Sequence, residues 1–258
     1  MEARYKTGLV LSGGGARGFA HLGVIRALND KGIFPGIVSG TSAGAIVGAL
    51  YADGYSPDEI MKLMNSKSSF DFFSFTMPRM GFMKISGVDK ILRSSLRASR
   101  FEDLKIPLVI AATDLNNGKV VYFSEGELIP AIIASASIPV LFLPQEIEGI
   151  QYVDGGVLDN LPVMPLEGKC DFLVGSFVNP TGNEEHLTSV IQIAMRTFML
   201  SVSRELNEKA GKFDLLFAPP ELKDYKILDP SQAGELFDLG YNITTRQLNQ
   251  MDISGMIN

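Results

Sequence analysis

A serine inside a run of small residues is the strongest chemical candidate in this chain. Ser42 lies between Gly40 and Gly44 in Gly-Thr-Ser-Ala-Gly. The apolar residues 33–38 precede this pentapeptide, and the helix-forming residues 43–51 follow it. Strand, Gly-x-Ser-x-Gly and helix form the layout of a nucleophile elbow, in which small neighbours permit a sharp turn and expose the hydroxyl. The pattern predicts that Ser42 attacks a carbonyl carbon.

A serine hydroxyl is a weak nucleophile until a base takes its proton. Asp154 is the better candidate for that base, because Gly155 and Gly156 follow it and leave room for another segment to come close. Partial desolvation would raise the basicity of its carboxylate. Asp-Gly is also a common turn pair. Asp114 and Asp159 are rival carboxylates, each placed where a turn or cap residue is expected.

The chain has two histidines, and histidine is the usual base beside a serine nucleophile. His21 lies in the first predicted helix, where we expect a packing or hydrogen-bonding role. His186 lies in a polar stretch before a long predicted helix, where we expect an exposed side chain. The order Ser42, Asp154, His186 is nevertheless that of an α/β-hydrolase triad, so this triad stays an alternative.

A glycine-rich loop joins the first predicted strand to the first helix. Gly13, Gly14 and Gly15 present backbone N–H groups near a helix N-terminus, where they could stabilise an oxyanion. Arg17 could hold the loop or attract an anionic head group. Gly13, Gly15 and Gly18 also match the spacing of a dinucleotide-binding loop, which is a rival interpretation. No acidic residue ends the next strand to hold a ribose, however.

Strand and helix patterns alternate along the chain. They predict an α/β protein with a mainly parallel sheet sandwiched between helices. Residues 66–86 show neither a helical nor a strand periodicity of apolar residues. Within this segment, residues 70–85 are interpreted either as an irregular cover for the core or as an apolar flap beside the active site. The predicted strands are 7–12, 33–39, 106–113, 119–123, 145–153, 172–178 and 213–217, with hairpin turns at 117–118 and 148–149. The predicted helices are 19–30, 43–54, 56–64, 88–96, 128–137, 187–209 and 230–248.

Composition excludes several classes of protein. The formal net charge of −6 argues against general nucleic-acid binding. No apolar run is long enough to span a bilayer, and the first residues lack a signal-peptide pattern. The single cysteine, Cys170, cannot form an intramolecular disulfide and is expected in the core, so a reducing compartment fits. We therefore expect a cytoplasmic protein without a metal or another cofactor.

Three motifs together resemble the patatin-like phospholipase family, and most of all its small bacterial members. They are Gly-Gly-Gly-x-Arg-Gly at 13–18, Gly-x-Ser-x-Gly at 40–44 and Asp-Gly-Gly at 154–156. The resemblance implies a three-layer α/β/α sandwich and a Ser–Asp dyad without histidine. It also implies that the glycine-rich loop forms the oxyanion hole and that the substrates are acyl esters of lipids.

The resulting hypothesis is a lipid acyl hydrolase of the phospholipase A or lysophospholipase type. Residues 1–258 are expected to form one catalytic domain, with the motifs in about 7–178 and a helical part in 187–258. Contact with a membrane or micelle surface, at the inner membrane face, is left open, as is the oligomeric state. A non-enzymatic protein that binds a lipid or nucleotide is the other alternative. The expected site is Ser42 as nucleophile and Asp154 as base, with Gly13, Gly14 and Gly15 as oxyanion donors and Arg17, Gly40, Gly44, Gly155 and Gly156 in support.

Overall fold

A computed structural model describes residues 5–65, 86–183 and 186–256. Its centre is an eight-stranded sheet in the order β5-β6-β3-β2-β1-β7-β8, with β4 paired to β3. Strands β3, β2, β1, β7 and β8 run parallel, whereas β4, β5 and β6 pair antiparallel at one side. The predicted mainly parallel sheet is confirmed. The strands are β1 Tyr5–Leu11, β2 Ile37–Thr41, β3 Leu108–Asp114, β4 Lys119–Phe123, β5 Gln145–Ile147, β6 Ile150–Asp154, β7 Cys170–Ser176 and β8 Leu215–Phe217.

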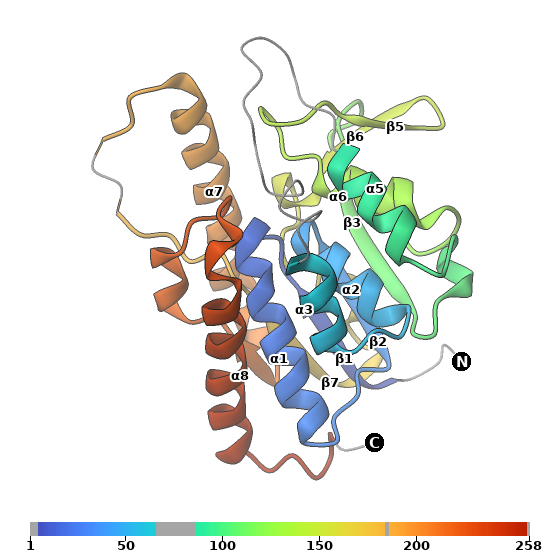
Figure 1. Ribbon diagram of the computed structural model, residues 1–258, viewed down its shortest axis with the longest axis vertical. Helices are drawn as coiled ribbons and strands as arrows, with labels where there is room; N and C mark the ends of the chain where they lie inside the picture. Colours follow the sequence, from blue (N-terminus) through green and yellow to red (C-terminus); the bar gives the residue numbers. More distant parts are fainter. Residues whose placement is uncertain (1–4, 66–85, 184–185, 257–258) are drawn as a thin grey trace.

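Helices cover both faces of the sheet, as Figure 1 shows. Successive side chains of a strand point to opposite faces. Leu9 and Leu11 of β1 pack in the cluster formed with α1, α2 and α8, whereas Val10 belongs to a second cluster that contains Leu206 of α7. These two clusters make a three-layer α/β/α arrangement. The helices are α1 Phe19–Asp30, α2 Ala43–Ala52, α3 Pro57–Asn65, α5 Ser86–Ser95, α6 Leu128–Ala136, α7 Val190–Lys209 and α8 Ala233–Asn249.

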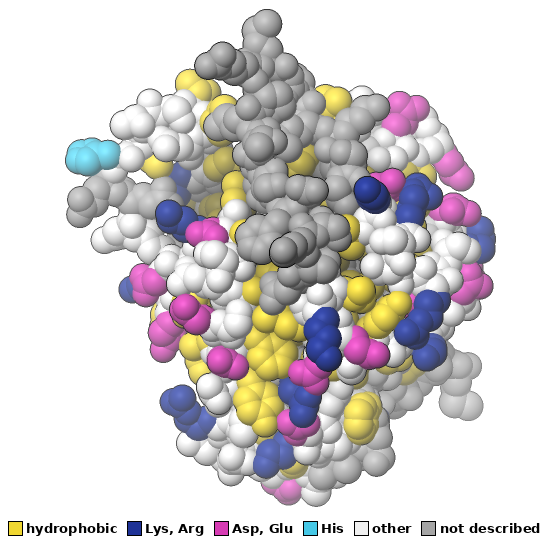
Figure 2. Space-filling model, in the orientation of Figure 1, with side chains coloured by type: hydrophobic (Ala, Val, Ile, Leu, Met, Phe, Trp, Pro, Cys, Tyr) yellow, Lys and Arg dark blue, Asp and Glu magenta, His cyan; other side chains and the backbone are white. Residues whose placement is uncertain are grey.

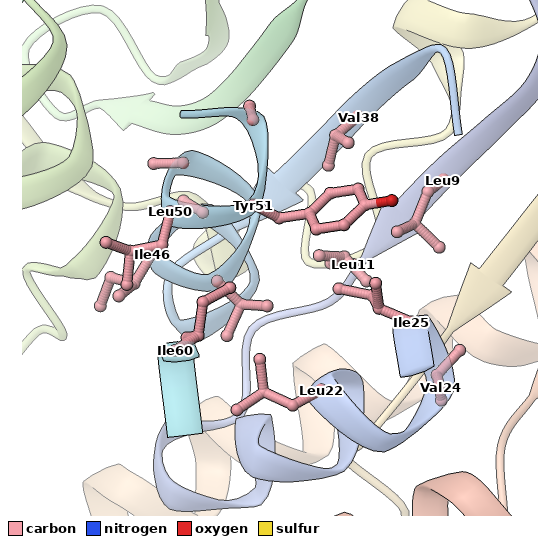
Figure 3. Packing of buried hydrophobic residues seen from close by; sticks show 14 of the residues in the cluster. Leu9, Leu11, Leu22, Val24, Ile25, Val38, Ile46, Leu50, Tyr51 and Ile60 are labelled. Atoms are coloured by element: carbon pink, nitrogen blue, oxygen red, sulfur yellow. The ribbon is translucent and has the colours of Figure 1, made fainter. Parts of the chain in front are cut away.

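The larger cluster joins β1 and β2 to the helices that carry the glycine-rich loop and the elbow. Leu22 and Ile25 of α1, and Leu50 of α2, are almost fully buried against the sheet (Figure 3). Burying such a side chain contributes about 1.5–3 kcal/mol relative to leaving it exposed. The two helix N-termini are therefore held firmly beside the carboxyl ends of β1 and β2.

Helix α8 lies along α1 (Figure 1). A Cβ atom added to Gly23 would lie 2.0 Å from the carbonyl oxygen of Phe237, and one added to Gly240 would lie 2.1 Å from that of Ala20. Glycine at both positions lets the two backbones touch. The C-terminal part of the chain thus belongs to the main core.

Several local signals are confirmed by the structure. Ser56 and Glu59 form a capping box at the start of α3, with the amide of each residue bonded to the side chain of the other. Gly118 has a positive φ in the turn between β3 and β4. Glu148 and Gly149 both have positive φ between β5 and β6, as a two-residue hairpin turn requires.

Some boundaries differ from the predictions. Strand β2 begins at Ile37 instead of residue 33, because Pro35 has no N–H for the ladder and Phe34 is half exposed. The first tail helix begins at Val190, where Ser189 and Gln192 form a capping box. A 3-10 turn, Pro230–Gln232, precedes α8. Residues 66–85, which include the predicted flap, lie outside the described residues.

On the face drawn in Figure 2, basic and acidic side chains of the described residues are interspersed, and apolar side chains gather near the middle of the lower half. None of the described helices is both long and apolar enough to cross a bilayer. Cys170, which was expected in the core, is only partly buried and packs against the second cluster.

Candidate active site

Ser42 occupies a strained turn between β2 and α2. Its φ is 52° and its ψ is −117°, which is unusual for a residue with a side chain and costs about 1–3 kcal/mol. A Cβ atom on Gly44 would lie 2.3 Å from the Leu11 carbonyl oxygen, and one on Gly40 would lie 2.6 Å from that of Gly44. Both positions therefore require glycine, because a neighbouring carbonyl oxygen occupies the space that a side chain would need. The predicted nucleophile elbow geometry is present.

A second serine holds the elbow in place. The amide of Ser42 donates to Oγ of Ser135 in α6 over 2.8 Å. That hydroxyl in turn donates to the carbonyl oxygen of Ala111 in β3 over 2.6 Å. The relay ties the strained turn to both the neighbouring strand and a helix. Sequence reasoning missed Ser135, because a serine inside an apolar helix has no local pattern that marks it.

The sheet brings Asp154 to the elbow. Ala111 of β3 pairs with Thr41, the residue before Ser42, and Ala112 pairs with Asp154 at the end of β6. The carboxylate of Asp154 accepts the amide of Gly156 over 2.8 Å, and it lies close enough to the Ser42 hydroxyl for that hydroxyl to lower its pKa. A Cβ atom on Gly155 would lie 2.3 Å from the Ala111 carbonyl oxygen, so the turn must be glycine.

Burial changes the acidity of this carboxyl group. Asp154 is 2% exposed, and desolvation raises its pKa to about 7, although the hydrogen bonds from Ser42 and Gly156 oppose the shift. Desolvation disfavours the charged form of a carboxyl group and so makes its carboxylate a stronger base. A carboxyl group with this pKa can accept and return a proton near neutral pH.

The glycine-rich loop lies beside Ser42. A Cβ atom on Gly13 would be 3.1 Å from Cβ of Ser42. The Gly13 amide donates to the Asn160 carbonyl oxygen over 3.3 Å. Hydrogen bonds among the described residues leave the amides of Gly14 and Gly15 unused. Two backbone donors are thus available in a loop that lines the same pocket as Ser42.

Arg17 holds the loop from behind. Its side chain is 7% exposed, and its guanidinium donates to the carbonyl oxygens of Tyr225, Pro180 and Lys223 over 2.7, 3.3 and 3.2 Å. Of the two roles considered for Arg17, the structure favours the support of the loop, because the guanidinium is directed at backbone. The loop is therefore anchored to the C-terminal part of the chain.

A pocket opens in front of Ser42 and Asp154. Its polar lining comes from the three motifs and two asparagines. Its apolar lining comes largely from the part of the chain after residue 180, for which the sequence suggested no functional role. The lining residues are Gly13, Gly14, Gly15, Ser42, Ile138, Asp154, Asn160, Asn179, Met195, Phe198, Met199, Val202 and Ile227. Four of these side chains belong to one face of α7. The pocket can hold a polar reacting group next to an apolar chain.

The rival residues have other surroundings. His21 is buried, with Nδ1 2.7 Å from Ser176 Oγ and Nε2 2.9 Å from the Ser12 carbonyl oxygen; burial lowers its pKa to about 4, so it is a neutral structural residue. His186 is exposed and does not line the pocket. Asp114 accepts the amides of the β3–β4 turn.

Asp159 belongs to a charged group behind the pocket. Its carboxylate binds the ammonium of Lys209 and the hydroxyl of Tyr122. Lys209 also binds Glu205, whose carboxylate accepts the backbone amide of Asn160. This network joins α7 to the segment that follows the Asp-Gly-Gly turn. The Asp159 carboxylate therefore has a structural role.

Asn160 and Asn179 are the polar lining residues that sequence reasoning missed. Nδ2 of Asn179 donates to the Gly13 carbonyl oxygen over 2.6 Å. Asn160 lies six residues after Asp154, and Asn179 comes three residues after the end of β7. For Asn179, its place just beyond the carboxyl end of a parallel strand was the available signal, since such ends gather at one edge of a sheet. Asn160 follows the antiparallel strand β6 and has no such signal.

The fold and the site define an α/β protein with a serine and a carboxylate at the carboxyl edge of its sheet. More specifically, the chain belongs to the patatin-like phospholipase family, whose model matches residues 9–167. An NTE family protein of Mycobacterium tuberculosis, uncharacterized by its own name, is 33% identical over 219 residues, which cover 79% of this chain and 61% of that protein. Lysophospholipase NTE1 of Saccharomyces cerevisiae is 27% identical over 265 residues, covering 90% of this chain and 16% of the yeast protein.

Solved structures share the fold. VipD from Legionella pneumophila matches with a TM-score of 0.55 and 18% identity over 96% of this chain and 68% of VipD. The type III effector protein ExoU matches with a TM-score of 0.50 and 18% identity over the whole chain and 55% of ExoU. The chain therefore spans only part of the length of these relatives and structures.

Proposed function

We propose that this chain is a serine hydrolase of lipid acyl esters, of the phospholipase A or lysophospholipase type. Ser42 is its nucleophile and Asp154 its only base. The observation that carries the proposal is the position of the Ser42 hydroxyl beside a buried carboxylate, in one pocket, where the pKa of that carboxyl group is raised to about 7. Membership in the patatin-like phospholipase family and the similarity to proteins named lysophospholipase support the lipid substrate.

The first half of the reaction forms an acyl-enzyme. Oγ of Ser42 attacks the ester carbonyl carbon while Asp154 takes the hydroxyl proton, and the carbonyl π electrons move to the oxygen. The amides of Gly14 and Gly15 donate to this oxyanion. The oxyanion then re-forms the carbonyl, the ester C–O bond breaks, and the leaving alcohol takes the proton from Asp154.

The second half releases the fatty acid. A water molecule attacks the acyl carbon while Asp154 takes one of its protons. The second tetrahedral oxyanion uses the same two amides and then expels Oγ of Ser42, which takes the proton back from Asp154. A carboxyl group with a pKa near neutrality suits this exchange, because it gives and takes protons at similar cost.

We also propose where the lipid contacts the protein. The acyl chain lies against Met195, Phe198 and Met199 on the inner face of α7. On the opposite face, the outer stripe of α7 (Val190, Ile193 and Leu200) is exposed, with Val190 82% exposed. An apolar stripe next to a lipid pocket suits peripheral contact with a membrane or micelle, in the cytoplasm, at the inner membrane face. The proposal includes no nucleic acid, metal or other cofactor.

The test is the activity of a Ser42→Ala variant on a panel of phospholipid, lysophospholipid and triacylglycerol substrates. We expect wild-type turnover on at least one lipid ester and labelling by a fluorophosphonate probe, and the loss of both in Ser42→Ala with an unchanged melting temperature. Ser94→Ala, an exposed serine on α5, is the matched control. Unchanged turnover in Ser42→Ala would refute the proposal.

Two alternatives make different predictions. A Ser42–Asp154–His186 triad requires that His186→Ala lose several orders of magnitude in turnover, whereas the dyad predicts nearly full activity because His186 is exposed. A non-enzymatic binding protein requires that wild type show no esterase activity. Thermal stabilisation by nucleotides and not by lipids would favour the nucleotide-binding version of that alternative.

A further inference from the structure

The side chain of Asn160 has an unused donor at the active site. Asn160 is 2% exposed and lines the pocket together with Ser42 and Asp154. Its Nδ2 is buried and has no hydrogen-bond partner among the described residues. Leaving a buried amide donor without a partner destabilises the folded protein. We expect such an unpaired donor in a pocket to find its hydrogen-bond partner on the molecule that the pocket binds.

The position of the carboxamide places it beside both halves of the site. Its Oδ1 lies 2.6 Å from where a Cβ atom on Gly13 would be, and that Gly13 position is 3.1 Å from Cβ of Ser42. A Cβ atom on Gly156 would lie 3.0 Å from this Oδ1 and 3.0 Å from Oδ1 of Asp154. The side chain therefore fits between the glycine-rich loop and the Asp-Gly-Gly turn, next to the nucleophile.

The backbone of Asn160 is held independently of its side chain. Its amide and that of Leu161 donate to the carboxylate of Glu205, over 2.8 Å and 3.1 Å. Its carbonyl oxygen accepts the Gly13 amide, and Thr41 Oγ1 donates to the carbonyl oxygen of Asp159 over 2.9 Å. The backbone that carries the carboxamide is thus fixed before substrate arrives, which is part of the preorganisation that electrostatic stabilisation of a transition state needs. A half-turn about χ2 exchanges Oδ1 and Nδ2 at the position beside the nucleophile.

We propose that Asn160 is a further catalytic residue, whose Nδ2 donates a hydrogen bond to the tetrahedral oxyanion beside the amides of Gly14 and Gly15. The inference rests on the proposed esterase function. It gives the oxyanion a side-chain donor from the segment after the Asp-Gly-Gly turn, in addition to the two backbone donors. Asn160 takes no part in proton transfer, because a carboxamide neither gains nor loses a proton near neutral pH.

The test uses Asn160→Asp, which keeps the shape of the side chain and removes the donor when ionised, and Asn160→Ala. On a soluble p-nitrophenyl ester, we expect kcat to fall by about 10²–10³-fold with little change in KM. Asn160→Gln, which keeps the donor, should retain more activity than either. Asn183→Ala, an exposed asparagine, is the matched control and should equal wild type.

A second measurement separates this role from a purely structural one. The affinity for a trifluoromethyl ketone, which forms a tetrahedral adduct with Ser42, should weaken by a factor close to the loss in kcat/KM in each variant. The affinity for a non-hydrolysable ether analogue of the ester should not change. This parallel loss follows only if the side chain contacts the oxyanion.

The two proposals fail in different ways. If wild type hydrolyses esters through Ser42 while both Asn160→Asp and Asn160→Ala stay within roughly threefold of wild type in kcat, the inference about Asn160 is wrong and the proposed function stands. A fall in kcat without any loss of affinity for the ketone also overturns it. If wild type hydrolyses no ester, both proposals are wrong. Should Asn160→Asp not fold, Asn160→Ala alone decides.

Discussion

At the scale of single residues, Ser42 and Asp154 are each held in a state that is unfavourable by itself. Ser42 has a positive φ, and Asp154 is a carboxyl group removed from water. Ser135 and Gly44 hold Ser42 at its positive φ, and the amide of Gly156 partly compensates for the burial of the Asp154 carboxyl group. Stored strain of this kind is found where geometry serves a purpose other than stability.

The pKa of Asp154 sets a pH dependence for activity. The proposed base must be ionised in the free protein, and burial raises its pKa to about 7. We therefore expect kcat/KM on a soluble ester to rise with pH up to an apparent pKa near 7 and to level off above it. A profile that stays flat between pH 5 and pH 8, measured with wild type, would contradict this role.

The Asp154 carboxyl group makes stability fall as pH rises, whereas a salt-bridged aspartate makes stability rise with pH. Its pKa is 3.8 unfolded and about 7 folded, so between these values the folded state binds more protons and stability falls as pH rises. Asp154→Asn removes this loss. We expect its melting temperature to exceed that of wild type by a few degrees at pH 8 and the difference to shrink toward pH 4, measured by calorimetry in one buffer series. A variant that is equally destabilised at every pH would contradict the assignment.

At the scale of elements, the glycine-rich loop depends on segments far along the chain. The Arg17 guanidinium binds three carbonyl oxygens between Pro180 and Tyr225, and the amide of Ala16 donates to the Ile227 carbonyl oxygen. A planar guanidinium can serve several acceptors at once, whereas an ammonium group is a point charge. The loop therefore takes its shape from tertiary contacts as well as from its glycines.

Arg17→Lys should accordingly loosen the loop. We expect a loss of about 1–3 kcal/mol in the free energy of unfolding, measured by urea denaturation, because charged hydrogen bonds to backbone are lost. Turnover should fall with it, and equally for anionic and zwitterionic lipids, since the side chain faces the backbone. Arg204→Lys, at an exposed ion pair, is the control. A selective loss on anionic lipids would instead assign Arg17 to head-group binding.

Helix α7 is joined to the site by the partly buried network of Lys209, Glu205 and Asp159. Lys209→Met leaves two carboxylates without their cation, so we expect a loss of about 3–5 kcal/mol in the free energy of unfolding, measured by urea denaturation. Lys212→Met breaks an exposed pair with Glu167, and its expected cost is about 0–1 kcal/mol. Equal losses in the free energy of unfolding for the two variants would show that the network stabilises the folded protein no more than an exposed ion pair does.

At the scale of the whole molecule, α7 has two apolar faces with different surroundings. Met195, Phe198, Met199 and Val202 line the pocket, whereas Val190 and Ile193 lie on the opposite side, as the 3.6-residue period requires. One helix thus borders both the pocket and solvent. This arrangement depends on the packing of α7 over the second face of the sheet, where Leu206 joins the smaller cluster.

The outer stripe of α7 leads to a test of lipid contact. Val190→Ser combined with Ile193→Ser should weaken sedimentation with phosphatidylcholine vesicles, and hydrolysis of micellar substrate, by about tenfold, because less apolar surface leaves water on binding. Activity on a soluble short-chain ester should not change. Phe34→Ser, an exposed apolar side chain before β2, is the control. If the control weakens vesicle binding as much as the double variant, the stripe is not the contact.

Much of the fold followed from local patterns. The alternation of strands and helices, the hairpins and the capping box at Ser56 are short-range features, and the structure contains them. Boundaries such as the start of β2 were less predictable, because Pro35 competes with an apolar run. That residues 1–258 form one domain stays a prediction.

The sequence by itself determined the family and marked Ser42 as the predicted nucleophile, because each of the three motifs is an unbroken run of residues whose types indicate its chemistry. Tertiary structure decided which carboxylate lies beside Ser42, what surrounds the histidines, and that Asn160 and α7 border the pocket. The physical reason is that proximity and burial are properties of the folded chain. Asp114, Asp154 and Asp159 are alike in sequence, but only Asp154 is placed by β3 against Ser42, and its pKa is raised because the fold removes it from water.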